Sequence, residues 1–296
     1  MTNTAAMLRP LETPADLVVW GSPQPLMMRT AALLNRVLPR GKGAVPRWIG
    51  RRFGGGWTTT IRTDSGCVLA VDPANLDLFV TIEREGAWEP WIRRVCGLAM
   101  RDGGVMFDVG ANAGAIANET ALACPGITVK AFEPQLELAK LVVVSAALNR
   151  LDDIEVFPVA VGESSGMVEL HKPAHALHAS LKACGEAGET SVTVPLVSLD
   201  DLVASQRIPP PNFIKVDVEG GELGVLKGAL RLLAQHQPAV IFEVNESSER
   251  FGYARDDLFG LFRQCGPYTF FRVAPGDVLA CPEARTDQFA PYYSRL

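Results

Sequence analysis

The stretch VMFDVGANAG, residues 105–114, decides the fold of this chain. A short apolar run carrying Asp108 near its end is followed by Gly110 and Gly114, which stand four residues apart, and then by small residues. This pattern predicts a buried strand, a tight turn and a helix, an arrangement that presents free backbone N–H groups to a ligand. We therefore expect a nucleotide-type binding loop here, with an α/β fold built around it.

The residues of this loop narrow the choice of ligand. The loop lacks the Gly-Lys-Ser/Thr ending of a Walker loop, and its Gly-x-x-x-Gly spacing differs from the G-x-G-x-x-G of a dinucleotide fingerprint. An acid at the strand end accepts hydrogen bonds from an ammonium group or a ribose hydroxyl, whereas it repels a pyrophosphate. Further along, Glu133 ends the next apolar run, where Rossmann-like folds place the carboxylate that binds a ribose. The pair Asp108 and Glu133 favours S-adenosylmethionine, which carries an amino group, a sulfonium and no phosphate.

Strands and helices are predicted to alternate through the rest of the chain. Short apolar runs predict buried parallel strands at 127–132, 154–161, 213–218 and 239–244, with helices between them at 115–123, 135–149 and 222–235. Residues 268–273 and 278–281 flank a turn and predict a hairpin, which would place an antiparallel strand at the sheet edge. The expected fold is a doubly wound sheet.

The N-terminal region differs in composition from the rest. Residues 1–56 are rich in Pro, Gly and Arg, and the periodicity of 26–38 predicts an amphipathic helix. A hairpin at 57–71 and helices at 75–86 and 88–100 are expected to lead into the core. We divide the chain into an N-terminal extension and cap, 1–95, and a Rossmann-like domain, 96–296. The extension could cover the active site, mediate dimerisation or touch a membrane surface, and a solvated helix face on a cap is the simplest reading.

Composition sets the broad class of protein. With 296 residues, of which 48% are apolar and 21% charged, the chain predicts a well-packed globular core. A net charge of −5 argues against nucleic acid as the main partner. The six cysteines are scattered without a C-x-x-C pair, which favours free thiols in a reducing cytoplasm over zinc or disulfides. No signal peptide and no membrane span is recognised, so we expect a cytoplasmic protein.

Acidic residues at strand ends are the candidates for chemistry, because ligands in such a sheet bind at the carboxyl ends of the strands. Asp217 could take the proton of a substrate hydroxyl, or could hold a divalent ion together with Glu243. Lys215 shares a strand face with Asp217 and must be paired if it is buried, with Asp108 or Glu243 as its partner. A structural ion pair explains Lys215 at least as well as a catalytic role does.

Three histidines and one aromatic–acid pair complete the candidates. His171, His175 and His178 have spacings that would align them on one helical face, which suits a metal or a general base. A nearby proline and glycines favour a loop instead, so we predict no metal site and a base or substrate contact from one of them. We interpret Trp88 as packing and Glu89 as a favourable charge near a helix start.

In their order and spacing these motifs resemble the FkbM-type family of S-adenosylmethionine-dependent methyltransferases. The resemblance runs over residues 86–243 and rests on GAWE (86–89), FDVGANAG (107–114), FEP (132–134), SL (180–181), VSLD (197–200), IKVDVEGGE (214–222) and LKGA (226–229). It implies a class I methyltransferase fold and methyl transfer, most often to a hydroxyl oxygen of a sugar or secondary metabolite. An NAD-dependent oxidoreductase and a non-catalytic S-adenosylmethionine-binding protein are the alternatives, although the missing dinucleotide fingerprint and the acidic strand ends count against them.

The resemblance also implies roles for individual residues. The expected donor contacts are Asp108, Gly110, Ala111, Asn112, Gly114 and Glu133, with Ala160 and Val161 near the adenine. We assign Asp217 and His178 as candidate proton acceptors, and Glu219, Glu243, Ser180 and His175 as contacts to a small-molecule or glycan acceptor. The histidines and the first 56 residues lie outside the family pattern, so substrate choice could reside there. Methylation of N or C, metal dependence and a homodimer are left open.

Overall fold

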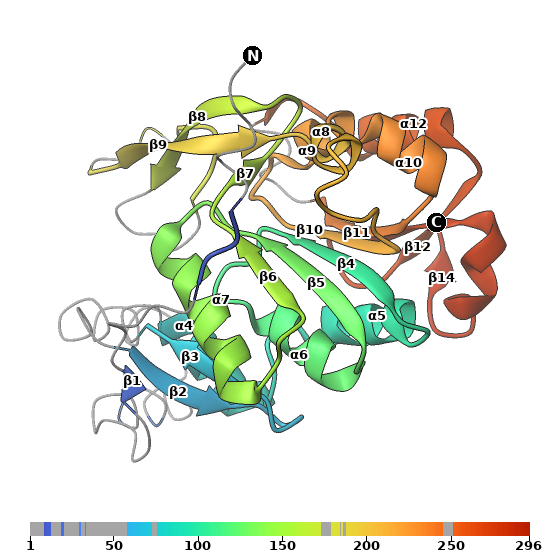
Figure 1. Ribbon diagram of the computed structural model, residues 1–296. Helices are drawn as coiled ribbons and strands as arrows, with labels where there is room; N and C mark the ends of the chain where they lie inside the picture. Colours follow the sequence, from blue (N-terminus) through green and yellow to red (C-terminus); the bar gives the residue numbers. More distant parts are fainter. Residues whose placement is uncertain are drawn as a thin grey trace.

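The main body of the protein is a mixed sheet covered by helices on both faces. The computed structural model describes residues 9–12, 19–20, 30, 33, 58–72, 76–172, 179–183, 185, 188–244 and 251–296. Within these residues the main sheet has eight strands in the order β14-β12-β13-β11-β10-β4-β5-β6 (Figure 1). Their bounds are β4 (Gly104–Val109), β5 (Ile127–Phe132), β6 (Ile154–Phe157), β10 (Phe213–Val216), β11 (Ala239–Glu243), β12 (Tyr268–Arg272), β13 (Asp277–Pro282) and β14 (Ser294–Arg295).

The strand pairings confirm the doubly wound sheet and the antiparallel hairpin at one of its edges. β6, β5, β4, β10 and β11 pair in parallel, as predicted. β12 and β13 form the predicted hairpin, but β13 inserts between β11 and β12 and pairs antiparallel with both. The short β14 adds to the far side of β12, so the hairpin and β14 together form this edge of the sheet.

Two helical layers bury the two faces of this sheet. One layer holds α5 (Pro90–Met100), α6 (Ala115–Ala123) and α7 (Leu136–Asn149); the other holds α8 (Leu199–Ala204), α9 (Glu222–Lys227), α10 (Leu230–His236) and α12 (Arg255–Cys265) (Figure 1). The alternation of strand side chains divides the core accordingly. Met106 packs with Ile116 of the first layer, whereas its neighbour Phe107 packs with Leu226 of the second.

Two predicted elements are each split in the structure. The predicted strand 154–161 becomes β6 and β7 (Ala160–Val161), because Pro158 lacks the N–H that would continue the ladder. The predicted helix 222–235 becomes α9 and α10, with a break at Gly228. A Cβ at Gly228 would lie 2.0 Å from the carbonyl oxygen of Gly162, so this position requires glycine for a close approach of the two segments.

A second sheet, which the sequence analysis did not predict, lies over the carboxyl ends of the parallel strands (Figure 1). It consists of β7, β9 (Thr190–Val197) and β8 (Gly166–Lys172), in that order. β9 pairs in parallel with β7 and antiparallel with β8. His171 lies on β8, so the helical alignment of the histidines does not include it; His175 and His178 lie outside the described residues.

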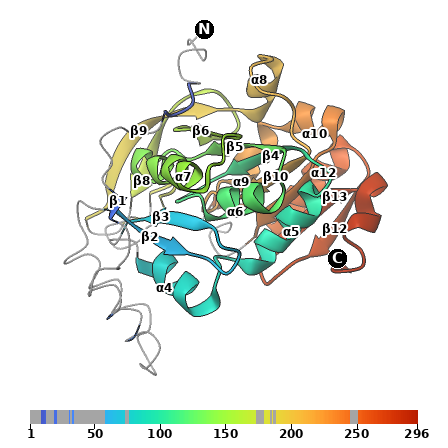
Figure 2. The same cartoon turned by 60° about the horizontal axis from the view of Figure 1, so that its bottom comes forward.

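A third, smaller sheet docks on the outside of α7 (Figure 2). β2 (Thr58–Arg62) and β3 (Val68–Val71) form the predicted hairpin, and β1 (Val19–Trp20) pairs in parallel with β2. The backbone N–H of Ala70 donates to Ser145 Oγ of α7 over 2.9 Å. α4 (Leu76–Glu85) and α5 confirm the two helices expected next, and the predicted helix at 26–38 falls outside the described residues.

The predicted division of the chain at residue 95 falls within α5 and stays a prediction. No helix in the described part of the chain combines the length and the apolar character needed to cross a bilayer.

Candidate functional site

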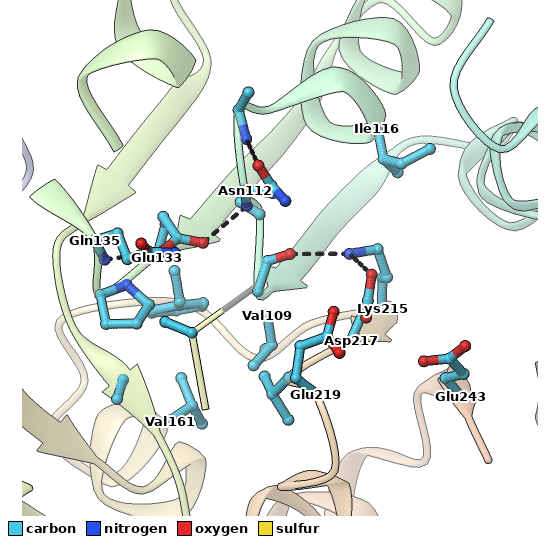
Figure 3. A pocket seen from close by; sticks show the side chains of 18 of the residues that line it. Val109, Asn112, Ile116, Glu133, Gln135, Val161, Lys215, Asp217, Glu219 and Glu243 are labelled. Carbon is cyan, nitrogen blue, oxygen red and sulfur yellow. Dashed lines mark hydrogen bonds and ion pairs between the residues drawn. The ribbon is translucent and has the colours of Figure 1, made fainter. Parts of the chain in front are cut away.

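A cavity of about 380 Å³ opens at the carboxyl ends of β4, β5, β10 and β11. Its lining includes residues 109–113, 132–135, 159–161 and 217–219, with Glu243 (Figure 3). The site lies where β4 is flanked by β5 on one side and β10 on the other, which is the topological switch point where α/β sheets bind ligands. Its volume falls within the roughly 300–1,000 Å³ of small-molecule sites.

The glycine loop after β4 forms the floor of this cavity. Gly110 has φ 78°, and a Cβ on it would lie 1.8 Å from the carbonyl oxygen of Asp217. Glycine therefore lets the loops that follow β4 and β10 approach each other closely. Asn112 also has a positive φ of 51°, and its Oδ1 accepts a hydrogen bond of 2.7 Å from the N–H of Ala113. Gly114 lies behind the loop, against Val142 of α7, and does not line the cavity.

Glu133 presents a fixed carboxylate to the cavity. Its Oε2 accepts from the N–H of Asn112 over 2.9 Å, and its Oε1 accepts from the N–H of Gln135 over 2.8 Å (Figure 3). Burial raises the pKa of Glu133 to about 7, against the opposing effect of these two hydrogen bonds. Each carboxylate oxygen has a further lone pair, so two ligand hydroxyls could bind to a group that is already oriented.

Lys215 crosses beneath the glycine loop and joins two strands. Its Nζ lies 3.3 Å from Asp217 Oδ2 (Figure 3). It also lies 3.2 Å from Asp108 Oδ1 and donates to the carbonyl oxygen of Gly110 over 3.0 Å. The predicted partner Asp108 is confirmed. Burial disfavours the charged lysine, but the carboxylates of Asp108, Asp217 and Glu89 together raise the pKa of Lys215 above its ordinary value.

Asp108 lies behind the cavity wall. It is fully buried, and burial raises its pKa although Lys215 acts in the opposite direction. Asp108 is absent from the cavity lining, so it influences the cavity through Lys215. Its direct contact with a donor stays a prediction.

The loop after β10 carries two of the predicted acidic residues into the cavity. Asp217 and Glu219 line it, and Glu243 at the end of β11 lies beside them (Figure 3). Glu219 has a left-handed backbone, with φ 57°. Of the three acidic strand ends that the sequence placed at one sheet edge, the structure thus brings Asp217 and Glu243 into the cavity, together with Glu219, whereas Asp108 lies behind its wall. The chemical roles of these carboxylates stay predictions.

The model of the methyltransferase FkbM domain matches residues 108–267, which is more than half of the chain. The chain belongs to the FkbM methyltransferase family. Its Rossmann-like sheet, with β13 inserted antiparallel beside β11, is the class I methyltransferase fold that the sequence led us to expect.

Two relatives show how far sequence similarity to other family members extends. The chain is 34% identical over 149 residues to the hexuronic acid methyltransferase AglP of Haloferax volcanii, an alignment that covers 48% of this chain and 56% of AglP. It is 31% identical over 165 residues to the 31-O-demethyl-FK506 methyltransferase FkbM of Streptomyces tacrolimicus, covering 45% of this chain and 62% of that protein. The chain therefore matches less than two thirds of the length of either relative.

Solved structures also include similar chains. The methyltransferase FkbM from Methylobacillus flagellatus superposes with a TM-score of 0.43 and 19% identity, over 70% of this chain and 54% of that one. TYW2 of M. jannaschii, solved in complex with AdoMet, gives the same TM-score at 12% identity, over 77% of this chain and 85% of that one.

In this FkbM-family chain, Glu89 is a cavity residue that the sequence analysis missed. We interpreted it as a helix-start charge, but Glu89 and Trp88 both line the cavity. Burial raises the pKa of Glu89 to about 7, and the carboxylates of Asp217, Asp277 and Glu243 add to the effect while Lys215 opposes it. The available signal was the GAWE motif, in which an acid directly precedes Pro90.

Other predicted contacts are distributed differently. Ala160 and Val161 line the cavity, whereas Ser180 is buried beside it between the lining residues Ala179 and Leu181. Ser180 Oγ donates to the carbonyl oxygen of Glu219 over 3.3 Å, so it supports the loop. The predicted roles of His175 and His178 fall outside the described residues. Within the described ranges, no three His, Cys, Asp or Glu side chains are grouped to hold a metal ion.

Proposed function

We propose that this protein is an S-adenosylmethionine-dependent methyltransferase that methylates a hydroxyl oxygen of a sugar or secondary metabolite. The observation that carries the proposal is the carboxylate of Glu133, held by two backbone N–H groups at the rim of the glycine loop. This arrangement suits the two ribose hydroxyls of the donor. The donor contacts we propose are Gly110, Ala111, Asn112 and Glu133, with Ala160 and Val161 beside the adenine.

The remaining lining suits the other parts of the donor. Val159, Ala160 and Val161 offer an apolar wall to a planar base. The carboxylates on the opposite side favour a ligand with an ammonium group and a sulfonium, and they disfavour the pyrophosphate of NAD. When bound, S-adenosylmethionine supplies an electrophilic methyl group, and the protein contributes orientation and exclusion of water.

The charge of the lining also bears on the acceptor. The charged side chains among the described lining residues are Glu89, Glu133, Asp217, Glu219 and Glu243, with Lys215 as the single cation. That cation is already paired with Asp108 and Asp217. A free carboxylate, such as that of the hexuronic acid in the name of AglP, would be repelled in this cavity. We therefore favour a neutral sugar or a neutral polyol-type metabolite.

Isothermal titration calorimetry tests the proposal. We expect wild-type protein to bind S-adenosylmethionine and S-adenosylhomocysteine with Kd values in the micromolar range, and not to bind NADH. Glu133→Gln should weaken both about 10- to 100-fold, because a hydrogen bond to a charged group is lost. Glu137→Gln, four residues further on at the exposed first turn of α7, is the matched control and should leave both affinities unchanged. Binding of NADH in place of the methyl donor would contradict the proposed function.

A further inference from the structure

Glu89 occupies a position that packing alone does not explain. It joins α4 to α5, directly before Pro90, and its backbone is left-handed with φ 43° and ψ 64°. A non-glycine residue in this conformation is strained, and such strain persists only where the surrounding structure enforces it. Here the strained backbone delivers a carboxylate into the cavity wall. Strain of this kind is common where a side chain must be presented to a ligand.

The charged groups around Glu89 come from four elements. On its own helix, the guanidinium of Arg93 pairs with Asp64 and Glu119, directed away from the cavity. Lys215 and Asp217 of the β10 segment and Glu243 at the end of β11 line the same cavity as Glu89. Their charges and that of Asp277 on β13 act on the Glu89 carboxyl group. Three carboxylates and one ammonium group therefore act on Glu89, and that ammonium group is paired with Asp108 and Asp217. This environment favours the protonated form of Glu89.

Three other carboxyl groups near Glu89 are engaged in contacts that make them poorer proton acceptors. Asp217 lies 3.3 Å from the ammonium group of Lys215, so a proton arriving there would disrupt an ion pair. Glu133 accepts from the backbone at both oxygens and is assigned to the donor ribose. Asp277 accepts from Trp91 Nε1 over 2.8 Å, and it is not part of the cavity lining.

We propose that Glu89 is the proton acceptor of the transfer reaction and that the acceptor consequently reacts through a neutral hydroxyl group. This inference rests on the proposed function. In the step, the acceptor O–H bond breaks and its proton moves to a carboxylate oxygen of Glu89. The acceptor oxygen bonds to the methyl carbon as the carbon–sulfur bond breaks, with that electron pair left on sulfur. A carboxylate acceptor is already deprotonated at neutral pH and would need no such base.

A binding experiment tests whether Glu89 titrates in the cavity. We would measure, from pH 6 to pH 8, the ratio of the affinities for S-adenosylmethionine and S-adenosylhomocysteine. The two ligands share the ribose, so an effect of Glu133 on the ribose cancels in the ratio, and only the sulfonium charge differs. In the wild type the ratio should rise roughly five- to tenfold as Glu89 ionises, because its negative charge favours the sulfonium.

Variants identify the titrating group. Glu89→Gln should make the ratio independent of pH, whereas Glu89→Asp, which keeps a carboxylate, should retain the rise. Asp277→Asn and the exposed Glu85→Gln on α4 are controls and should also retain it. A rise that persists in Glu89→Gln, or that disappears only in Asp277→Asn, overturns the inference while the proposed function stands. Absence of S-adenosylmethionine binding to the wild type overturns the proposed function itself.

A rate measurement tests the base role directly. Methyl transfer from labelled donor would be followed with pairs of acceptors, namely methyl glycosides of neutral hexoses and the matching hexuronides. Transfer to the neutral member, with kcat reduced about 10²- to 10⁴-fold in Glu89→Gln and partly restored in Glu89→Asp, is the expected result. Preferred transfer to the hexuronides, or an unchanged kcat in Glu89→Gln, would show that Glu89 is not the base.

Discussion

Gly110 has only a hydrogen atom as its side chain, and this allows the glycine loop to lie against the loop that follows β10. The backbone there is left-handed, and the carbonyl oxygen of Asp217 occupies the space that a methyl group would need. The carbonyl oxygen of Gly110 itself accepts a hydrogen bond from Lys215. One backbone position therefore couples the glycine loop to the ion pair beneath it.

Gly110→Ala should lower the free energy of unfolding by about 2–5 kcal/mol, since it adds both left-handed strain and overpacking against a backbone atom. Binding of S-adenosylmethionine should be lost with it. Gly97→Ala in α5 is the matched control, because a Cβ there meets nothing within 4 Å. That change should alter stability by at most about 1 kcal/mol, on the stabilising side. Urea unfolding measures the stability of both variants, and calorimetry measures their binding of S-adenosylmethionine. Equal effects of the two substitutions would contradict a special need for glycine at position 110.

At the scale of elements, the turn between β10 and α9 positions the acidic side of the cavity. Glu222 at the first turn of α9 accepts from the N–H groups of Val218 and Gly220, at 3.1 and 3.3 Å. Its second oxygen accepts from the hydroxyl of Tyr253 over 2.6 Å. Glu222 is buried, so these donors replace water around its carboxylate. The turn is thus organised by a side chain that does not itself line the cavity.

Tyr253→Phe removes one of these donors and leaves the carboxylate of Glu222 partly unsatisfied. The free energy of unfolding should fall by about 1.5–3 kcal/mol, the usual range for a buried hydrogen bond to a charged group. Tyr292→Phe, at a side chain that is 49% exposed, is the matched control and should change it by less than about 0.5 kcal/mol. Chemical denaturation measures the free energy of unfolding of both variants. An unchanged value for Tyr253→Phe would show that the turn does not depend on this contact.

For the whole molecule, burial of several carboxyl groups around one cavity makes stability depend on pH. Burial raises the pKa of Glu89 and Glu133 to about 7 and that of Asp277 to about 6. In the unfolded chain these groups ionise near pH 4. Between those values the folded state binds more protons than the unfolded state, so stability falls as pH rises.

The ligand-free protein should therefore be more stable at pH 5 than at pH 8, and the free energy of unfolding should differ by an amount on the order of 5 kcal/mol. Glu89→Gln should flatten part of this slope, because one of the three groups no longer titrates. Urea unfolding at pH 5, 6, 7 and 8 measures how the free energy of unfolding depends on pH, with Glu85→Gln as the surface control. Stability that rises over this range would show that these carboxyl groups are not destabilised by burial.

The sequence by itself determined the central strand–turn–helix, the parallel strand set and the acidic strand ends. These features depend on local periodicity and on glycine spacing, which short segments encode. It also predicted that Lys215 pairs with Asp108 or Glu243, because a lysine in a strand covered on both faces requires a partner. The structure shows the pair with Asp108 on the neighbouring strand.

Only the tertiary structure decided which residues complete the cavity and where elements end. Glu89 enters the site from a segment before the first core strand, by way of a strained backbone that no periodicity encodes. Gly228, where the predicted helix breaks, packs closely against the carbonyl oxygen of Gly162, and β13 inserts beside β11 through long-range pairing. The physical reason is common to all three. Each depends on contacts between segments distant in the chain, and such contacts form only once the layers have packed.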